Sequence, residues 1–421
     1  MPEKTRVALI KGEDPKISVN EAVDLLGGIE RFVRPRSVVL IKPNLMGPFP
    51  PETGMVTHTE VIRAVIDLCK KAGASRIIVG EDPFFSQSGR ETFRETGLEE
   101  LAKETGVETL DFEEDNWVEF KIPDGIGTKI ARFPQTVLSC NTLINVPKMK
   151  CHPQTMVTGA LKNFQGIMSD NDKLDITHGA PDYKCNPQPG GPPYPRLGLE
   201  YALVDLHRIV KTNLNIIDGI VGPETDHWGG RPDFKPGLIV AGEDPVAVDT
   251  VATKAMGLDP AMVNMIQIAH EVGIGTANLD EIEVVGESLN SVNAGFTVPP
   301  TFSVNSVEYK EPNLHLITGT TCNACLSGLL DPLHVVTNPS HGRLKSTDFE
   351  EMTIVVGKDA VIPYDYLGKL ILVGNCAVRQ YQGIHPFEEA IPCVGCPTPA
   401  LFFWRLWKRG QIKVLKKERT P

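Results

Sequence analysis

Short apolar runs alternate with amphipathic segments from the start of the chain, and this alternation limits the fold more than any other feature. VALI at 7–10 precedes the helix-like SVNEAVDLLGGIERFV at 18–33, and SVVLIKPN at 37–44 precedes HTEVIRAVIDLCKKAG at 58–73. Strand, helix and strand at these lengths predict parallel pairing, with helices on both faces of the sheet. Further strands are expected at SRIIVGEDP, TLINVPKMK, LNIIDGIVG, GLIVAGEDP and EIEVV. We therefore predict an α/β fold with a mostly parallel sheet.

Helix starts can also be read from the sequence. Ser18 with Glu21, and Thr57 with Glu60, have the spacing of a capping box. Asp244 directly precedes Pro245, an order typical of a helix cap followed by the first helical residue. The segment TMVTGALKNFQG at 155–166 is expected to be helical.

The chain divides into two predicted domains. Its 421 residues exceed the size of one ordinary core. Residues 287–312 contain turn formers and no helical period, so we expect a linker there. It separates an anion- or substrate-binding α/β domain at 1–286 from a smaller, cysteine-rich α/β domain at 313–421. The second domain holds five of the nine cysteines.

Composition excludes several classes of protein. No apolar run approaches the ~20 residues that span a bilayer. The amino terminus lacks the apolar core of a signal peptide, so we expect a cytoplasmic protein with no membrane partner. A formal net charge of -11 gives no support to nucleic-acid binding. In a reducing compartment, nine cysteines are not expected to form a disulfide scaffold.

The five carboxy-terminal cysteines follow three predicted strands. Cys322 and Cys325 come after LHLITGT, Cys376 after KLILVGN, and Cys393 with Cys396 after EEAIP. The carboxyl ends of neighbouring parallel strands meet at one edge, so these thiols are expected to converge. Four thiolates hold either zinc or an iron–sulfur cluster, and unligated thiols are the third alternative. The Cys-Pro pair at 396 favours the cluster.

TCNAC, GNCAV and CVGCPTP resemble the three cysteine segments of the small subunits of complex I and nickel-iron hydrogenases. The resemblance covers about a hundred residues and implies a 4Fe-4S cluster on a flavodoxin-like sheet. The implied ligands are Cys322, Cys325, Cys376 and Cys396. This chain departs from the pattern at Thr398 and has an additional cysteine, Cys393, which is the alternative ligand.

A second concentration of chemistry lies in INVPKMKCHPQTMVTGALKNFQG at 144–166. Its lysines and histidine surround a strand exit and an expected helix start, which together favour an anion such as carboxylate or phosphate. The predicted catalytic residues are His152, Lys148, Lys150 and His58. The predicted substrate-binding residues are Lys42, Asn44, Lys162, Asn163, Asp218 and Asp249. His152 as a packed turn residue and Lys150 as a surface residue are the structural alternatives.

Several stretches, IKPNLMGPFPPETGMVTHTEVI, NVPKMKCHPQTMVTGALKNFQG, IIDGIVG and EDPVAVDTVATKAMG, resemble the domain of unknown function 362 family in the same order. The resemblance spans about residues 5–287. It implies a prokaryotic cytoplasmic protein commonly coupled to iron–sulfur modules, and it implies no particular reaction. A fainter similarity connects the chain to the lactate racemase superfamily.

These features favour an iron–sulfur redox protein that binds an anionic small molecule and exchanges electrons with it or with a protein partner. The alternatives are a non-redox isomerase or racemase of an organic acid with a structural metal site, and a carrier or assembly factor without turnover. The Pro- and Gly-rich stretch 169–197 is typical of a lid over a site or of a contact between copies of the chain.

Overall fold

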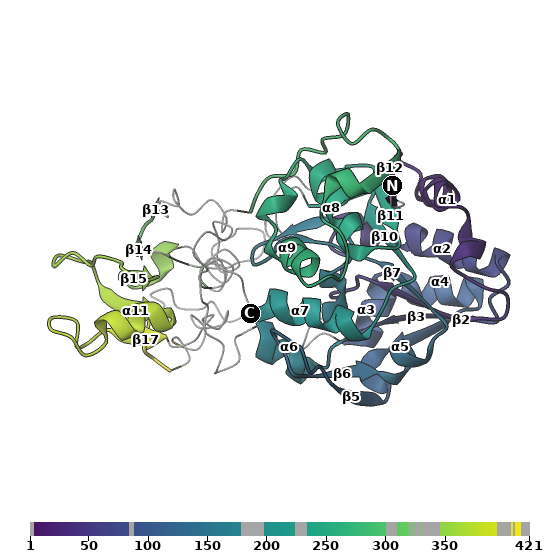
Figure 1. The fold of residues 1–421 in the computed structure, drawn as a ribbon. Helices are drawn as coiled ribbons and strands as arrows, with labels where there is room; N and C mark the ends of the chain where they lie inside the picture. The colour runs from purple at the N-terminus through teal and green to yellow at the C-terminus, as the bar shows by residue number, and fades with distance from the viewer. Residues whose placement is uncertain are drawn as a thin grey trace. The chain divides into compact units, whose positions relative to one another are not determined.

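The computed structural model divides the chain into two compact units, described separately below. The first comprises Met1–Leu174 with Leu199–Val298, and the second comprises Asp175–Gly198 with Pro299–Pro421. The residues that the structure describes are 4–83, 88–177, 198–223, 234–299, 310–319, 321, 325, 329, 346–393, 406 and 409–413. Figure 1 colours both units from the amino terminus to the carboxyl terminus.

An eight-stranded sheet forms the centre of the first unit, in the order β12-β1-β11-β10-β7-β2-β3-β4. The strands are β1 Thr5–Lys11, β2 Val38–Pro43, β3 Arg76–Glu81, β4 Glu108–Asp111, β7 Thr142–Val146, β10 Leu214–Gly219, β11 Leu238–Gly242 and β12 Ile282–Gly286. Strand β11 runs antiparallel to both of its neighbours, and all other pairs are parallel. The predicted mostly parallel α/β fold is confirmed.

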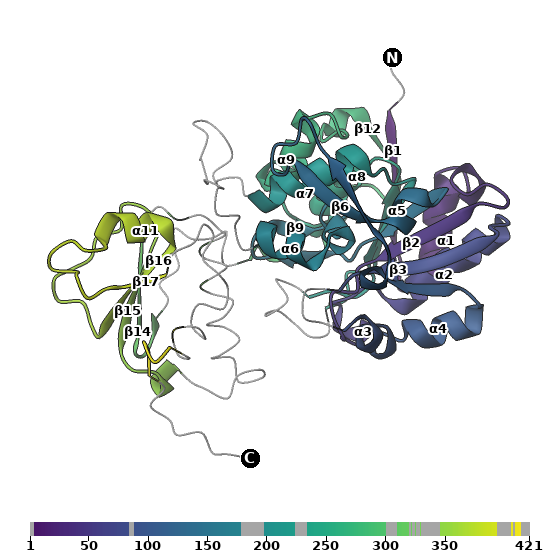
Figure 2. The same cartoon turned by 90° about the horizontal axis from the view of Figure 1, so that it is seen from below.

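Helices cover both faces of this sheet, as Figures 1 and 2 show. They are α1 Pro15–Leu25, α2 Thr59–Lys71, α3 Gly89–Glu95, α4 Leu98–Thr105, α5 Gln135–Ser139, α6 Asp170–Thr177, α7 Gly198–Ile209, α8 Pro245–Met256 and α9 Asn264–Glu271. Apolar residues of α1, α2 and α4 share one core with alternate residues of the strands. Helix α8 lies on the opposite face (Figure 2). Burial on both faces explains why the central strands are continuously apolar.

Both predicted capping boxes are wrong, whereas the predicted Asp244 cap is confirmed. Helix α1 begins earlier because the Asp14 side chain accepts the Ile17 N–H and Pro15 suits the first helical position. The Thr57 hydroxyl donates to the carbonyl of Val146, so the imidazole of His58 caps α2 instead. Asp244 caps α8 by accepting two backbone N–H groups of its first turn.

The predicted helix at 155–166 is also wrong. Strand β8 Lys150–His152 pairs antiparallel with β9 Met156–Thr158, and a 3-10 segment, η4 Lys162–Ile167, follows. The Asp249 carboxylate accepts the backbone N–H groups of Ala160 and Leu161 between them. Tertiary contacts therefore outweigh the helical period of this stretch. A further antiparallel pair, β5 Trp117–Lys121 and β6 Ile130–Pro134, lies outside the main sheet.

The second unit contains a smaller sheet in the order β13-β14-β15-β16-β17. Its strands are β13 Lys310–Glu311, β14 Leu314–Thr318, β15 Met352–Val356, β16 Lys369–Val373 and β17 Ile391–Cys393, and helix α11 spans Gly374–Tyr381. Strands β14 to β17 are parallel, as predicted for a smaller α/β unit. Alternate residues of these strands enter two separate apolar cores on the two faces of the sheet.

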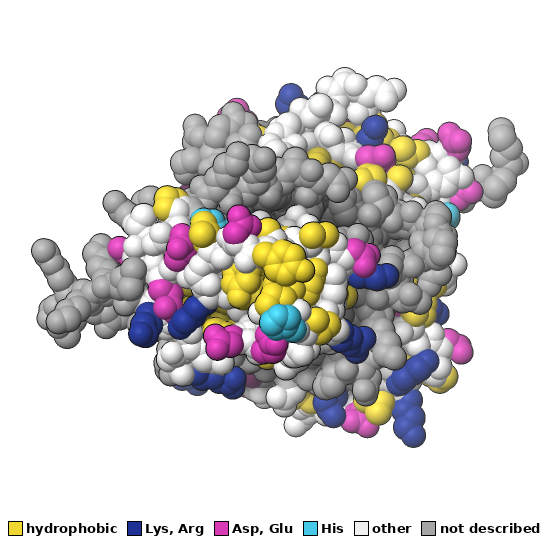
Figure 3. Space-filling view, turned by 90° about the vertical axis from the view of Figure 1, so that its left-hand side faces the viewer, with side chains coloured by type: hydrophobic (Ala, Val, Ile, Leu, Met, Phe, Trp, Pro, Cys, Tyr) yellow, Lys and Arg dark blue, Asp and Glu magenta, His cyan; other side chains and the backbone are white. Residues whose placement is uncertain are grey.

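The second unit also exposes large apolar side chains, namely Val361, Tyr364, Leu367 and Ile384. Figure 3 shows apolar side chains gathered on the face that it views. Within the described residues, no helix combines the length and the apolar character that crossing a membrane requires.

Candidate anion-binding site

The candidate site lies at the edge of the large sheet where β2, β3, β7 and β10 end. These four strands are parallel and adjacent in the order β10-β7-β2-β3. The chain continues from β2 through β3 to β4 on one side, whereas β7 and β10 lie on the other side. The boundary between β2 and β7 is thus a topological switch point, the usual ligand position in open α/β sheets.

Lys42, at the end of β2, forms a buried ion pair with Glu81, at the end of β3. The Lys42 Nζ to Glu81 carboxylate distance is 2.7 Å, and the two side chains are 1% and 2% exposed. Glu81 also accepts the backbone N–H groups of Leu45 and Asp82. Burial lowers the pKa of Lys42 while Glu81 opposes that shift. Such a pair contributes little net stability, but removal of one partner leaves the other charge buried alone.

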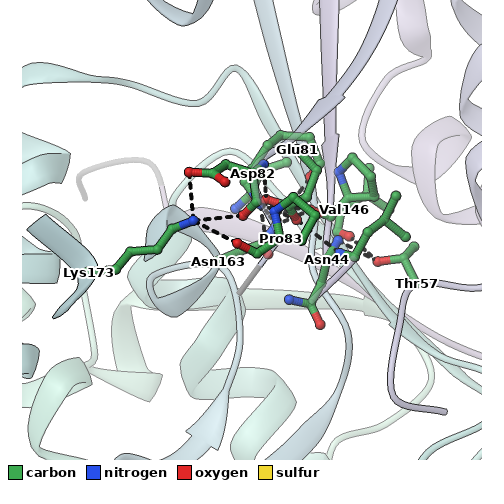
Figure 4. Close-up of polar contacts among 12 residues, drawn as sticks. Asn44, Thr57, Glu81, Asp82, Pro83, Val146, Asn163 and Lys173 are labelled. Carbon is green, nitrogen blue, oxygen red and sulfur yellow. Dashed lines mark hydrogen bonds and ion pairs between the residues drawn. The ribbon is translucent and has the colours of Figure 1, made fainter. Parts of the chain in front are cut away.

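Buried amides extend from this ion pair into the sheet. Asn163 accepts a bond from Lys42 Nζ at 3.3 Å and donates to the Asn145 side chain at 2.7 Å. Asn145 in turn donates to Asn215 on β10 at 3.0 Å. Figure 4 shows Asn163 and Glu81 among the polar contacts at this edge. Because every member has a partner, the network fixes the relative position of β2, β7, β10 and η4.

Lys148 forms the second buried ion pair, with Asp218 of β10. The two charged atoms are 2.8 Å apart, and both side chains are 0% exposed. Asp218 also accepts the backbone N–H groups of His58 and Ile220. The ring Nδ1 of His58 accepts the Glu60 N–H, which uses that nitrogen as a helix cap. The predicted residues His58, Lys148 and Asp218 therefore do come together.

Lys150, on β8, has a different environment. Its ammonium lies 3.1 Å from Asn44 Oδ1, 3.1 Å from Met46 Sδ and 2.8 Å from the Met55 carbonyl, and all three are neutral acceptors. The residue is 3% exposed, so the interpretation as a surface lysine is wrong. Burial, followed by the charges of Lys162 and Lys148, lowers the pKa of Lys150 well below its ordinary value.

Lys162, at the start of η4, has one neutral partner, the side-chain oxygen of Gln165 at 2.7 Å. It is 8% exposed. Burial is the main cause that lowers its pKa to about 7, and the positive charge of Lys42 adds to the effect. A lysine with this pKa is partly neutral near pH 7.

Four lysines thus share the site with two carboxylates, and these carboxylates pair with only two of the lysines, Lys42 and Lys148. Within the described part of the chain, neither Lys150 nor Lys162 forms an ion pair. Burying an uncompensated ammonium is costly, so such a lysine either becomes neutral or binds an anion. The site is therefore prepared for a ligand that carries negative charge.

Two further predicted residues lie at the margin of the cluster. The His152 Nδ1 accepts the backbone N–H groups of Gln154 and Thr155, as in the alternative of a packed turn residue. Asp249, on α8, binds the backbone of Ala160 and Leu161, and its burial raises its pKa to about 7. Asp249 consequently positions the segment that carries Lys162.

Sequence reasoning missed Glu81, Asn145 and Asn215, although Glu81 ends a predicted strand and could have been included on that ground. It also missed a neighbouring acidic group, Asp82, Glu113 and Asp170, whose carboxylate oxygens lie within 4.8 Å of one another. That geometry could hold a cation. The ammonium of Lys173 lies 2.6 Å from Asp82 and 3.5 Å from Asp170, so the chain supplies a cation of its own (Figure 4).

In the second unit, three of the predicted thiols are described. Cys325 and Cys393 are buried in one apolar core, whereas Cys376 is exposed on α11 directly after β16. Cys393 pairs with Val373, the last residue of β16. Cys322 and Cys396 lie outside the described residues. The predicted four-thiolate cluster stays a prediction.

The fold and the site together define an α/β protein with a cluster of buried lysines at the carboxyl ends of its parallel strands. Residues 39–254 match the family described as domain of unknown function (DUF362), which is 216 of the 421 residues. The chain belongs to that family, and this part of the predicted resemblance is confirmed. The resemblance of the second unit to complex I and hydrogenase subunits stays a prediction.

One relative is the thylakoid-associated protein sll1697 of Synechocystis, 27% identical over 257 residues, which cover 61% of this chain and 74% of that protein. Among solved structures, the lactate racemase apoprotein from Thermoanaerobacterium thermosaccharolyticum has a TM-score of 0.40 at 10% identity, covering 85% of this chain and 70% of that one. A Thermotoga maritima protein has a TM-score of 0.37 at 10% identity, with 82% and 72% covered. These two structural likenesses are too low to indicate chemistry.

Proposed function

We propose that the first unit binds a small organic acid at the lysine cluster and catalyses a non-redox rearrangement of it, of the isomerase or racemase type. The observation that carries this proposal is the pair Lys150 and Lys162, two buried lysines without a carboxylate partner in the described part of the chain. They lie beside Lys42 and Lys148, whose charges are already neutralised by Glu81 and Asp218.

The electrostatics favour a carboxylate ligand. Two unit charges ~4 Å apart interact by about 4 kcal/mol at an effective dielectric constant of ~20. A carboxylate beside Lys150 would supply the counter-charge that its three neutral acceptors lack. It would also raise the pKa of Lys150 towards its ordinary value, because an opposite charge favours the ammonium.

Proton transfer is the chemistry that the remaining lysine supports. An acid or base works best when its pKa lies near the working pH, and burial places the pKa of Lys162 at about 7. Removal of a proton from the carbon next to a carboxylate moves negative charge onto the carboxylate oxygens. A fixed ammonium at Lys150 would stabilise that charge, and Lys162 would accept and return the proton.

Hydrogen exchange in deuterium oxide tests this proposal directly. We expect a panel of 2-hydroxy and 2-oxo acids, incubated with the full chain, to include at least one that gains deuterium next to a carboxylate or carbonyl. Proton NMR measures the loss of that signal. Lys162→Met should abolish exchange and retain binding, Lys150→Met should weaken binding, and substitution of the exposed Lys103 should change neither.

Two outcomes would contradict the enzyme proposal in different ways. Tight binding of an acid without exchange for any member of the panel would favour a carrier. No calorimetric binding of any carboxylate or phosphate would remove the anion site itself.

An iron–sulfur redox role is the second candidate. It is favoured by the position of Cys376 directly after β16, and by Cys325 and Cys393 in one core of the same small sheet. The predicted ligands Cys322, Cys325, Cys376 and Cys396, with Cys393 as the alternative, would contribute thiolates, and the bound cluster would supply one-electron transfer. Oxygen-free purification followed by iron and sulfide analysis tests it. About four of each per chain would support a 4Fe-4S centre, whereas zinc alone would exclude it.

A further inference from the structure

We propose that Lys162 is a nucleophile that forms a reversible imine with the carbonyl carbon of a 2-oxo acid, whose carboxylate lies beside Lys150. This inference rests on the proposed anion site and names its substrate class. Lys162 would bind the carbonyl carbon and Lys150 would bind the carboxylate. The hydrogen bonds of the buried lysines distinguish these two roles.

Of the five buried lysines in the described residues, three pair with carboxylates. The Nζ atoms of Lys42, Lys148 and Lys173 lie 2.7, 2.8 and 2.6 Å from carboxylate oxygens of Glu81, Asp218 and Asp82. While such an ion pair is in place, the nitrogen directs its protons at the carboxylate and has no electron pair to offer a ligand. None of these three lysines is a candidate nucleophile.

Lys150 and Lys162 differ in how many acceptors surround the nitrogen. An ammonium has three protons, and Lys150 has three acceptors on the chain, so its nitrogen is enclosed in a geometry that suits an ammonium once a bound carboxylate offsets the lowered pKa of Lys150. Among the residues that the structure describes, Lys162 has one acceptor, Gln165 Oε1. A neutral amine can donate one proton to that oxygen and still direct its electron pair at a ligand. Lys162 is therefore the buried lysine whose hydrogen bonding suits a nucleophile.

The surroundings of Lys162 support the neutral amine. Burial and the nearby charge of Lys42 place its pKa at about 7, which leaves a large neutral fraction near physiological pH. Buried lysines of this kind act as Schiff-base residues because the free amine is the reactive form. The side chain of Lys162 retains 8% exposure, and its partner Gln165 is partly exposed.

The position of Lys150 favours a carbonyl compound that also carries a carboxylate. Lys150 donates to Asn44, and the side chain of Asn163, the residue after Lys162, donates to the carbonyl of Pro43, the residue before Asn44. Both lysines therefore belong to segments that contact the end of β2, and Lys162 is one of the charges that lower the pKa of Lys150. A 2-oxo acid carries its carbonyl on the carbon next to the carboxylate. One small molecule can thus present the carbonyl to Lys162 and the carboxylate to Lys150, whereas a simple ketone would leave Lys150 without a counter-charge.

The step balances without an oxidant or a reductant. The nitrogen electron pair forms the carbon–nitrogen bond, and the carbonyl π pair moves to oxygen. The two amine protons then leave with that oxygen as water, which gives the imine. Protonation of the imine nitrogen acidifies the neighbouring C3–H. Because the Lys162 nitrogen is then part of the imine, water accepts the C3 proton, which gives an enamine. The resulting exchange at C3 is a non-redox proton transfer of the kind proposed above.

Reductive trapping tests the imine. The full chain is incubated with pyruvate or glyoxylate and sodium cyanoborohydride, and intact mass is measured. We expect one reduced adduct per chain, mapped by peptide sequencing to Lys162. Lys162→Met and Lys162→Arg should lose the adduct, and Lys103→Met should retain it. Lys150→Met should need a pyruvate concentration on the order of tenfold higher, because it removes the charge that faces the carboxylate.

A parallel measurement separates this inference from the proposed function. Oxalate has two carboxylates and no ketone or aldehyde carbonyl, so it tests the anion site alone by calorimetry. Binding of oxalate with no adduct at Lys162 from either oxo acid would overturn the imine and leave the anion site intact. Absence of both would remove the anion site and the imine together. If the Lys162 variants do not fold, the mapped position in the unaltered chain decides.

Discussion

Replacing Lys162 with methionine should change how the stability of the first unit depends on pH. The side chains are similar in length, and methionine removes the buried amine without creating a large cavity. In the unfolded chain Lys162 has its ordinary pKa of 10.5, whereas burial lowers the folded value to about 7. Between these two values the unfolded state binds more protons than the folded state, so the stability of the unaltered protein rises with pH.

The magnitude follows from the two pKa values. The difference between 10.5 and about 7 corresponds to about 5 kcal/mol at ~1.4 kcal/mol for each pKa unit. Proton linkage places about 2 kcal/mol of that gain between about pH 7 and about pH 9. Below about pH 7 both states are protonated, and the cost of burying the ammonium is fully present. Lys162→Met has no amine at this position, so its stability should lack this rise between about pH 7 and about pH 9.

Urea unfolding of the first unit, followed by circular dichroism at several pH values, measures the effect. The quantity of interest is the difference in unfolding free energy between the unaltered protein and Lys162→Met as pH rises. The Lys103→Met control should retain the pH dependence of the unaltered protein. Equal pH dependence in the unaltered protein and Lys162→Met would refute the account of a buried, easily deprotonated amine.

The remaining predictions concern the scaffold around the site. Glu81→Gln should destabilise the first unit by about 3–5 kcal/mol, because it leaves the buried Lys42 without a counter-charge. The double variant Lys42→Met/Glu81→Met should unfold at a higher urea concentration than Glu81→Gln, because it removes both buried charges. Gly166→Ala should cost about 1–3 kcal/mol in the same assay and weaken oxalate binding, because the new Cβ would lie 1.9 Å from Glu81 and 2.6 Å from Lys42; unchanged values would contradict the packing described. Asp205→Asn should speed hydrogen exchange in residues 126–128, whose three N–H groups the carboxylate accepts, and equal rates would count against that anchor.

The sequence alone predicted much of the fold, because buried parallel strands are continuous apolar runs and the helices between them are amphipathic. The strands containing Val39, Ile144 and Ile216 were found in this way. The segment around Met156 was missed, because its apolar spacing fits a helix, whereas the Asp249 carboxylate binds the backbone N–H groups of Ala160 and Leu161 just after β9. Local periodicity cannot report a carboxylate that lies about ninety residues away.

For the candidate site too, some features follow from the sequence and others only from the tertiary structure. The sequence by itself determined that lysines, amides and carboxylates follow the apolar strands, which was enough to predict an anion site. Only the tertiary structure decided which lysine is neutralised. Glu81 is 39 residues from Lys42, and Asp218 is 70 residues from Lys148. Charge pairing depends on distance in space and on burial, so Lys150 and Lys162 could be recognised as unpaired only after the sheet had brought its strand ends together.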